Sequence, residues 1–538
     1  MPDPARENGA QEPAAPPDNG STRLIGRGML VGGTGTLLSR LTGLARDIAY
    51  GAVFGTTGAY SMFLAVFTIP NLFRRVFGEG ALSEAFVPLF NEKLERHGKS
   101  AAFAFFSNVL LLTAAVLLAI VVAGALICLL LQQFFPDGRP ALVLALLPVM
   151  LPYTLFICLF GLLCGVLQSL RHFAAPAVAP VLLNVTLIAA TLWLCPRVGT
   201  TAEQMKVLAI AVVVAGVLQL AVLWPVLKRF GFALQRARPQ VTPDVKRLMH
   251  LMIPGVIGAS IYQINVMFDR ILALCLDPWS VAALAYSERL VYLPGGVFAV
   301  ALSAASLPLL SRAFAAGRQS DIVDALGYGL RQVFFVSVPC VLVLMYLGNA
   351  VVGLIYERGA FDADSARQTT AALMFYAPGI PAFAAVRIVR AGFYSRQDMK
   401  TPVRVGVFCL VLNVLLSLAL MVPLRHCGLA LSTTIAAYVN VAILMVLLKR
   451  DLQPTMQAWR NGLLAGARML VAVAVAGVAV WATAHFATTL ASPGLASKAI
   501  AVFLPLAAAA AAYLLVLHLV GAKEPGELFA AVRRRRDR

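Results

Sequence analysis

Charged residues are scarce in this chain of 538 residues: they make up 13% of it, while hydrophobic residues make up 60%. An average soluble domain is about 25% charged and about 45–50% apolar. The composition therefore excludes an ordinary soluble globular protein. Because one helical membrane span needs about 20 apolar residues, the chain is long enough for many of them. We expect an all-α polytopic membrane protein.

Several kinds of chemical site are also missing from the sequence. The eight cysteines form no CxxC pair and no cluster with histidine at metal-ligand spacing. We find no Ser/His/Asp grouping, no acidic metal cluster and no glycine loop that could cradle a phosphate. A disulfide framework and a zinc site are therefore not indicated. We expect a protein that is not an enzyme and that has no resident cofactor.

The net charge is +19, from 44 basic and 25 acidic residues. In a soluble protein this excess would suggest a nucleic-acid partner, but in a membrane protein the basic residues collect in cytoplasmic loops. Alternate connections between the predicted spans hold about three times as many Lys and Arg as the others, which places both termini in the cytoplasm. The C-terminal run AAVRRRRDR agrees with this orientation. We therefore expect membrane lipids, and not nucleic acid, around the chain.

Long apolar segments follow one another along most of the sequence, separated by short polar or Pro/Gly-containing breaks. Their pattern predicts about fourteen transmembrane helices, with ends uncertain by several residues. The predicted spans are 25–53, 58–78, 101–133, 141–168, 176–195, 205–227, 247–273, 279–310, 326–348, 367–393, 402–422, 428–448, 462–486 and 497–520.

The longest predicted cytoplasmic connection follows the sixth span and divides the chain. We therefore expect two six-helix lobes plus two C-terminal helices. The predicted parts are a disordered cytoplasmic tail (1–22), an N-terminal lobe (23–227), a cytoplasmic linker (228–246), a C-terminal lobe (247–450), the two C-terminal helices (451–522) and a basic cytoplasmic tail (523–538).

Ionisable residues inside the predicted spans are the informative ones. Each is costly there unless it faces a bundle interior or a water-filled cavity. The first span contains Arg40, Arg46 and Asp47. At about 100° per residue, Arg40 and Asp47 lie on nearly the same face of the helix, and Arg46 lies about 120° away from it. This charged face is not expected to point at lipid.

The second span ends in a sequence that interrupts a helix. Pro70 removes a backbone donor, and Gly78 and Gly80 loosen the chain beyond it. Arg74 and Glu79 therefore sit at or near a broken helix, where side chains can reach a central cavity. The alternative for Arg74 is an interface anchor that extends toward the cytoplasm.

Two acid–base neighbours occur further along. Asp269 and Arg270, in the seventh span, have two open interpretations: a structural pair that neutralises itself, or part of a site. Glu288 and Arg289, in the eighth span, precede a Pro-Gly-Gly sequence at 294–296. Interrupted spans of this kind often form transporter sites, which favours a functional role for this second pair.

Cations outnumber acids in the first lobe and where it meets the second, which predicts an anion-attracting cavity. Arginine suits phosphate because its planar fork donates two parallel hydrogen bonds and stays charged at any physiological pH. We therefore expect an amphiphilic ligand with a phosphate-bearing head. The tenth predicted span contains two further arginines, Arg387 and Arg390, which are spaced i, i+3 and so lie on one face of the helix. The residues expected to line the cavity are Arg40, Arg46, Arg74 and Arg289.

Four stretches resemble the MurJ/MviN family of lipid II flippases, within the multidrug and polysaccharide exporter superfamily. They are SRLTGLARD (39–47), PNLFRRVFGEGALSEAFVP (70–88), APAVAPVLLN (175–184) and GFYSRQDMKTPVR (392–404). The resemblance covers roughly residues 25–520.

The resemblance implies alternating access between two lobes, with lipid II moved across the bacterial inner membrane for peptidoglycan synthesis. It implies a cationic cavity and a groove for the polyprenyl chain in the last two helices. The family's functional residues fall here on Arg40, Arg46, Asp47, Arg74, Glu79 and Arg289. Ser61, Thr68 and Tyr292 depart from the family pattern, which puts any gating salt bridge at those positions in doubt.

The energy source stays open at this point. The membrane potential could reset a positively charged empty cavity. A second hypothesis is coupling to Na⁺ or H⁺ at a monovalent cation site formed by Asp269, Asn413 and Thr433. This site is weak on sequence alone, because Ser417 stands where a second carboxylate would be more persuasive.

Other functions compete with this interpretation. They are an exporter of another polyprenyl-linked oligosaccharide, a cation-coupled drug antiporter, a membrane-embedded transferase and a scaffold for cell-wall enzymes. An antiporter for cationic drugs would need an acidic cavity, which the arginines argue against. The transferase would need an acidic metal or base cluster that the sequence does not supply. We expect a monomer, with cell-wall synthesis enzymes as further partners.

Overall fold

The computed structural model describes residues 19–78, 81–235, 238–452, 456–489 and 494–527. Within these ranges the chain is helical apart from short connections, and it forms no strand. An all-helical fold is what the bilayer requires, because a helix satisfies its backbone donors and acceptors internally.

The first half of the chain forms helices that pack into one lobe. Its elements are α1 (Asn19–Phe54), α2 (Gly58–Phe73), η1 (Arg74–Gly78), α3 (Ala81–Gln132), α4 (Gly138–Ser169), α5 (Ala174–Ala189), η2 (Ala190–Leu194), η3 (Cys195–Arg197) and α6 (Thr201–Arg229). In this lobe α4 packs against α3 and α6, and α5 packs against α1 and α6.

The second half forms the other lobe. Its elements are α7 (Pro243–Leu274), α8 (Ser280–Ala315), α9 (Gln319–Ile355), α10 (Ala363–Tyr376), η4 (Ala377–Gly379), α11 (Ile380–Ser395), α12 (Lys400–Leu424), α13 (His426–Leu452), α14 (Met456–Thr489) and α15 (Leu495–Leu519). The last two helices pack against each other and against α9, so they extend this lobe.

The fourteen predicted spans coincide almost completely with helices. Two predicted spans correspond to helices of unexpected extent. The span 101–133 lies within α3, which is 52 residues long and bends at Gly98, where φ is 79°. The single span 367–393 is divided between α10 and α11. By length and hydropathy, ten helical segments among the described residues can cross a membrane, and α1, α7 and α8 are not among them. The count of fourteen crossings therefore stays a prediction.

The ends of the chain are only partly described. Helix α1 begins at Asn19, inside the predicted tail 1–22, and residues 1–18 lie outside the described ranges. The arginine run of the basic tail lies outside them as well.

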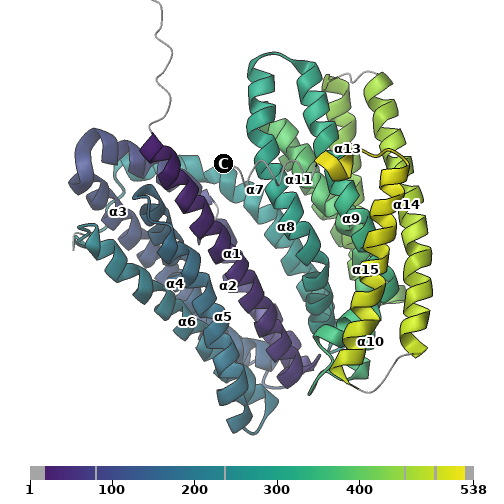
Figure 1. Ribbon diagram of the computed structural model, residues 1–538. Coiled ribbons are helices and arrows are strands. Elements are labelled where there is room, and N and C mark those ends of the chain that lie inside the picture. Colours follow the sequence, from purple (N-terminus) through teal and green to yellow (C-terminus); the bar gives the residue numbers. More distant parts are fainter. Residues whose placement is uncertain (1–18, 79–80, 236–237, 453–455, 490–493, 528–538) are drawn as a thin grey trace, which may run out of the picture.

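The two lobes meet at one end and diverge toward the other (Figure 1). Helix α7 belongs to both, because it packs against α2, η1 and α3 of the first lobe and against α12 of the second. Its start is tied to α3 by an ion pair of 2.8 Å between Lys93 and Asp244. The preceding connection is held to α3 by hydrogen bonds of 2.8 Å in both directions between Asn108 and Gln240.

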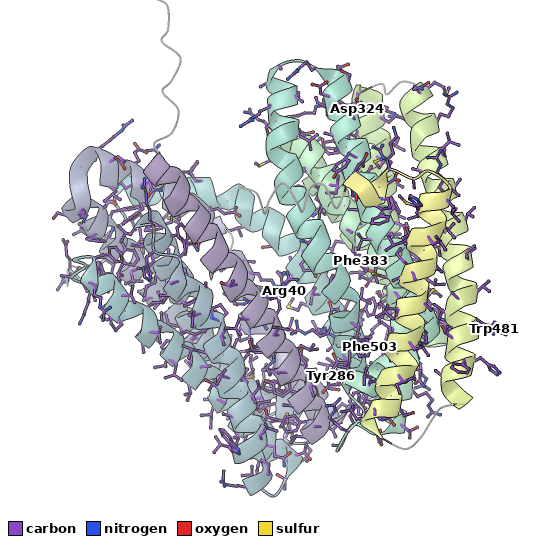
Figure 2. The ribbon with its side chains drawn as sticks, viewed as in Figure 1. Arg40, Tyr286, Asp324, Phe383, Trp481 and Phe503 are labelled. Carbon is purple, nitrogen blue, oxygen red and sulfur yellow. The ribbon has the colours of Figure 1, made fainter. Side chains whose placement is uncertain are left out.

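We call the region where the lobes meet the closed end; it consists of residues 50–61, 277–286 and 356–368. Aromatic rings fill it, and Tyr286 of α8 lies 5.8 Å from Tyr60 of α2 between ring centroids. The backbone amide of Ala360 donates to the carbonyl of Ala52 across the lobes at 2.8 Å. Figure 2 places Tyr286 where the two lobes come together.

Glycine permits this close approach of two backbones. At Gly359, where φ is 59°, an added Cβ would lie 2.2 Å from the carbonyl oxygen of Ala52. At Gly55, where φ is 54°, it would lie 2.3 Å from the carbonyl oxygen of Ala360. Both positions combine a left-handed conformation with contact too close for any larger residue.

Polar contacts complete the closed end. The hydroxyls of Thr56, in the first lobe, and Ser365, in the second, lie 2.8 Å apart. Asp362 caps α10 by accepting from the Ser365 amide at 2.8 Å, which holds the pKa of the Asp362 carboxyl below its usual value. The cap orders the first turn of α10 and so positions Ser365.

Candidate functional site

An acid on α1 lies at the centre of a charge network between the lobes. Asp47 Oδ1 accepts from Arg46 at 2.8 Å, and Asp47 Oδ2 lies 2.8 Å from Arg289 Nε on α8. The Asp47 side chain is only 9% exposed. One carboxylate therefore joins an arginine of its own lobe to an arginine of the other.

Arg46 is held inside the first lobe. Its Nη1 donates to Asn184 Oδ1 on α5 at 3.1 Å, and Asn184 Nδ2 donates to the Ser39 carbonyl at 3.1 Å. The Arg46 side chain is 10% exposed, and its guanidinium carbon lies 5.5 Å from the centroid of the Tyr50 ring. In this conformation Arg46 Nε and Nη2 therefore face Asp47 and Nη1 faces Asn184, and its role as a cavity-lining residue stays a prediction.

Arg289 is the exposed member of the network. Its side chain is 58% exposed, so most of it faces away from protein while Nε contacts Asp47. It lies one helical turn from Tyr286, on the side away from the closed end. An anion that enters between the lobes can therefore reach Arg289 without displacing buried side chains.

Glu288 and Arg289 are neighbours in sequence but have different partners. Glu288 Oε2 accepts from Arg270 Nη2 on α7 at 2.5 Å, and Arg270 Nη1 also donates to the Val281 carbonyl. Arg270 therefore pairs with Glu288, and the interpretation of Asp269 and Arg270 as a self-neutralising pair is replaced by this contact. The α7–α8 ion pair lies within the second lobe, and the Asp47–Arg289 pair links the lobes.

The three residues of the predicted cation site do come together. Asn413 Nδ2 of α12 donates to Asp269 Oδ1 at 3.1 Å, and Thr433 Oγ1 of α13 donates to Asp269 Oδ2 at 3.3 Å. Asn265, which the sequence reasoning missed, lies one turn before Asp269 and accepts from Asn413 at 2.9 Å. Its i, i+4 spacing from Asp269 is the signal that could have identified it.

The other predicted site residues lie at the edges of this arrangement. Figure 2 places Arg40 on α1, along the edge of the first lobe that faces the second. Arg74 is half-buried at the end of α2, where its Nε donates to Asn71 Oδ1 at 3.3 Å. Glu79 lies outside the described residues.

A contact that the sequence did not reveal connects η1 to the second lobe. Arg75, next to Arg74, is exposed, and its guanidinium carbon lies 5.7 Å from the Tyr262 ring centroid on α7. The hydroxyl of Tyr262 lies 3.2 Å from that of Tyr292 on α8. Tyr292, which stands where some relatives were expected to have an acid, therefore pairs with another tyrosine.

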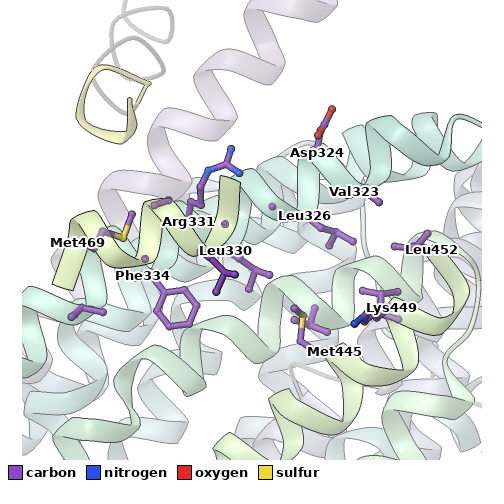
Figure 3. A pocket seen from close by; sticks show the side chains of 18 of the residues that line it. Val323, Asp324, Leu326, Leu330, Arg331, Phe334, Met445, Lys449, Leu452 and Met469 are labelled. Carbon is purple, nitrogen blue, oxygen red and sulfur yellow. The ribbon is translucent and has the colours of Figure 1, made fainter. Parts of the chain in front are cut away.

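An apolar cavity of about 560 Å³ lies within the second lobe, between α9, α13 and α14. Phe334, Met445 and Met469 contribute to its walls, and Arg331 lies along its border. Figure 3 shows Asp324 and Arg331 pointing away from Met445 on the facing helix. In the described part of the chain, no group of three or more His, Cys, Asp or Glu side chains is arranged to hold a metal ion.

Solved structures share this two-lobed fold. The structure titled "Lipid II flippase MurJ, inward closed conformation" matches with a TM-score of 0.72 at 22% identity, over 91% of this chain and 98% of that one. An inward-facing multidrug resistance MATE family transporter of the MOP superfamily matches with a TM-score of 0.64 at 16% identity, over 78% of this chain and 96% of that one. The chain therefore has the two-lobed helical membrane-protein fold of these structures.

Sequence relationships identify the family. The family described as "Lipid II flippase MurJ" matches residues 50–501. A "Probable lipid II flippase MurJ" of Rhizobium tropici is 33% identical over 523 residues, which are 95% of this chain and 97% of that protein. One of Vibrio cholerae serotype O1 is 32% identical over 518 residues, 94% of this chain and 97% of that one. This chain belongs to the lipid II flippase MurJ family.

The charge network predicts unequal effects of removing its members on stability. Asp47→Asn leaves the buried Arg46 without its carboxylate, so we expect the free energy of unfolding to fall by about 3–5 kcal/mol. Arg289→Gln removes an exposed partner, and we expect a loss below about 1 kcal/mol. Chemical denaturation of the purified chain in detergent measures both.

The matched control is Asp364→Asn, which removes a carboxylate from an exposed pair with Arg367. We expect no measurable change in that variant. Equal losses for Asp47→Asn and Arg289→Gln would contradict the assignment of Asp47 as the buried centre of the network.

Proposed function

We propose that this chain is a lipid II flippase. It moves the undecaprenyl-pyrophosphate-linked peptidoglycan precursor from the inner to the outer leaflet of the bacterial cytoplasmic membrane by alternating access. Family membership supports the substrate, and it makes the chain a transporter rather than an enzyme. The observation that carries the proposal is the exposed Arg289, which joins the second lobe to Asp47 of the first at 2.8 Å.

The network suggests how substrate binding and lobe movement are connected. A pyrophosphate oxygen offers Arg289 the same charge-assisted hydrogen bond as Asp47 does, with better fork geometry for a guanidinium. When Arg289 turns to the substrate, the ion pair between the lobes is lost, while Asp47 stays neutralised by Arg46. Binding thus weakens one contact that holds the present conformation, which shifts the population toward the alternative one.

The rival functions fit this arrangement less well. A drug antiporter needs acids that are open to a cationic ligand, whereas Asp47 and Glu288 each already have an arginine partner. An exporter of another polyprenyl-linked oligosaccharide would use the same cationic residues, so only the substrate itself separates it from a lipid II flippase. A scaffold for cell-wall enzymes would not require Arg289.

The polyprenyl chain lies along α14 and α15 and has the apolar cavity beside α9 available to it. Both termini face the cytoplasm, as the distribution of basic loops favours, so the lobes diverge toward the cytoplasmic side. The chain acts as a monomer, and cell-wall synthesis enzymes receive its product.

The transport proposal is tested by leaflet accessibility of lipid II in cells depleted of their native flippase. We expect the wild-type chain to restore the outer-leaflet precursor and Arg289→Ala to reduce export at least tenfold at equal membrane abundance. Arg318→Ala, which removes an exposed arginine paired with Asp321, is the matched control and should export normally. Absence of export by the inserted wild-type chain would contradict the proposal.

We further propose that a monovalent cation, Na⁺ or H⁺, acts at Asp269, Asn413 and Thr433 and contributes to the transport cycle together with the membrane potential. The donor set fits, because carboxylate, amide and hydroxyl oxygens suit hard cations. Asn413 is 1% exposed, and its Oδ1 atom has no hydrogen-bond partner among the described residues. Such a buried acceptor is available to a cation.

Ion replacement distinguishes the energy sources. At a fixed membrane potential, replacing Na⁺ with choline should slow export by the wild-type chain severalfold if Na⁺ is the ion, and a pH gradient should act in the same way if it is H⁺. Asp269→Asn should export slowly and respond to neither. Unchanged export in Asp269→Asn, together with no effect of Na⁺ or pH on the wild type, would contradict the cation site.

A further inference from the structure

Two arginines on α11 have no role in the network described above. Arg387 and Arg390 are spaced i, i+3 in a helix whose other side chains are mostly apolar. Arg387 is exposed and Arg390 is half-buried. A charged side chain inside a membrane bundle is costly and needs a partner or an aqueous cavity.

These two arginines differ from the others in the central region. Arg46, Arg270 and Arg289 each contact a carboxylate within 2.8 Å. The groups that act electrostatically on Arg390 are Tyr394, Cys409 and Arg387, and no acid is among them. The Arg390 Nε atom is buried and has no hydrogen-bond partner in the described part of the chain.

The helix geometry shows where the pair points. Phe383 precedes Arg387 by four residues and Arg390 by seven, so the three side chains lie on one face of α11. Phe383 contacts Tyr292 of α8 with ring centroids 5.9 Å apart. The pair therefore lies on the same face of α11 as Phe383, with Arg390 near Cys409 of α12, and further from the closed end than Phe383.

The first lobe approaches this same surface. Tyr292 is hydrogen-bonded to Tyr262, and Arg75 of η1 lies over the Tyr262 ring. Going away from the closed end, the order on the second lobe is Arg289, then Tyr292 with Phe383, then Arg387 and Arg390. Cationic groups thus occur at two levels, with aromatic rings between them.

We propose that Arg387 and Arg390 form a binding station for the phosphate groups of a lipid head on its way to Arg289. This inference rests on the proposed function and adds a second substrate contact to it. Residues at i, i+3 have Cβ atoms about 5–6 Å apart, so two guanidinium forks can hold neighbouring phosphates of one pyrophosphate. A bound phosphate would also give the Arg390 side chain, whose Nε has no partner in the described part of the chain, an acceptor.

A bilayer phospholipid offers similar phosphate chemistry from a different source. We assign the station to the transported lipid because its aromatic border leads to Arg289, which belongs to the contact between the lobes. A phospholipid of the surrounding bilayer is not the transported substrate, so its phosphate is not expected to move from these arginines to Arg289.

The test measures equilibrium binding to the full chain in phosphatidylcholine nanodiscs. The probes are undecaprenyl pyrophosphate, undecaprenol and phosphatidylglycerol. The variants are Arg387→Gln/Arg390→Gln and the charge-preserving Arg387→Lys/Arg390→Lys. The matched control, Arg312→Gln/Arg318→Gln, removes two exposed arginines from the end of α8 and the α8–α9 connection. Melting temperatures verify that each variant is folded, and lipid II export is measured for all of them.

We expect the glutamine pair to bind undecaprenyl pyrophosphate at least tenfold more weakly, with undecaprenol binding unchanged and export reduced. The lysine pair should recover part of the affinity, because charge remains while the fork is lost. Unchanged pyrophosphate binding in the folded glutamine pair would overturn the inference, as would a loss confined to phosphatidylglycerol. If the wild type exports no lipid II but binds undecaprenyl pyrophosphate through these arginines, the station stands and the proposed function fails.

Discussion

A carboxylate inside a membrane protein must be neutralised, and in this chain Asp47 is neutralised from both lobes at once. Arg46 supplies the partner from its own lobe, and Arg289 supplies the partner from the other. Because Arg46 alone can keep Asp47 compensated, Arg289 can leave without stranding a buried charge. This asymmetry makes the contact between the lobes reversible, which alternating access requires.

The closed end gives the charge network its position. Gly55 and Gly359 let two backbones touch, and the aromatic side chains around Tyr286 fill the space beside them. Arg289 lies one turn beyond this seal along α8, in the direction in which the lobes diverge (Figure 1). The contacts of the closed end close the other side of the region between the lobes. The same contacts also fix the distance between α1 and α8.

Helix α7 connects the two polar regions of the second lobe. Asp269 contacts α12 and α13, while its neighbour Arg270 holds Glu288 on α8. Glu288 in turn precedes Arg289. The proposed cation site therefore lies on the helix that also holds the neighbour of Arg289, and the start of that helix is attached to the first lobe through Asp244.

The sequence predicts the structure best where the bilayer restricts the conformations that the chain can adopt. The predicted spans coincide with helices because a chain segment in a bilayer has to satisfy its backbone hydrogen bonds internally. The free-energy cost of a charge inside a membrane was enough to identify Asp47 and Arg289 as candidate site residues. Partner choice was less predictable: helical periodicity gives the face of Arg270 but not the neighbouring helix, so its pairing with Glu288 appears only in the packed lobe. Asn184 was missed for the same reason, because it lies 138 residues from Arg46 in sequence.

Alternating access requires the closed end to open in every transport cycle. Thr56 and Ser365 have hydroxyls 2.8 Å apart across it, so cysteines at these positions can form a disulfide between the lobes. In a chain whose eight native cysteines are replaced, lipid II export should stop when Thr56→Cys/Ser365→Cys is oxidised and recover on reduction, with each single variant unaffected. Continued export by the fully cross-linked protein would contradict the account.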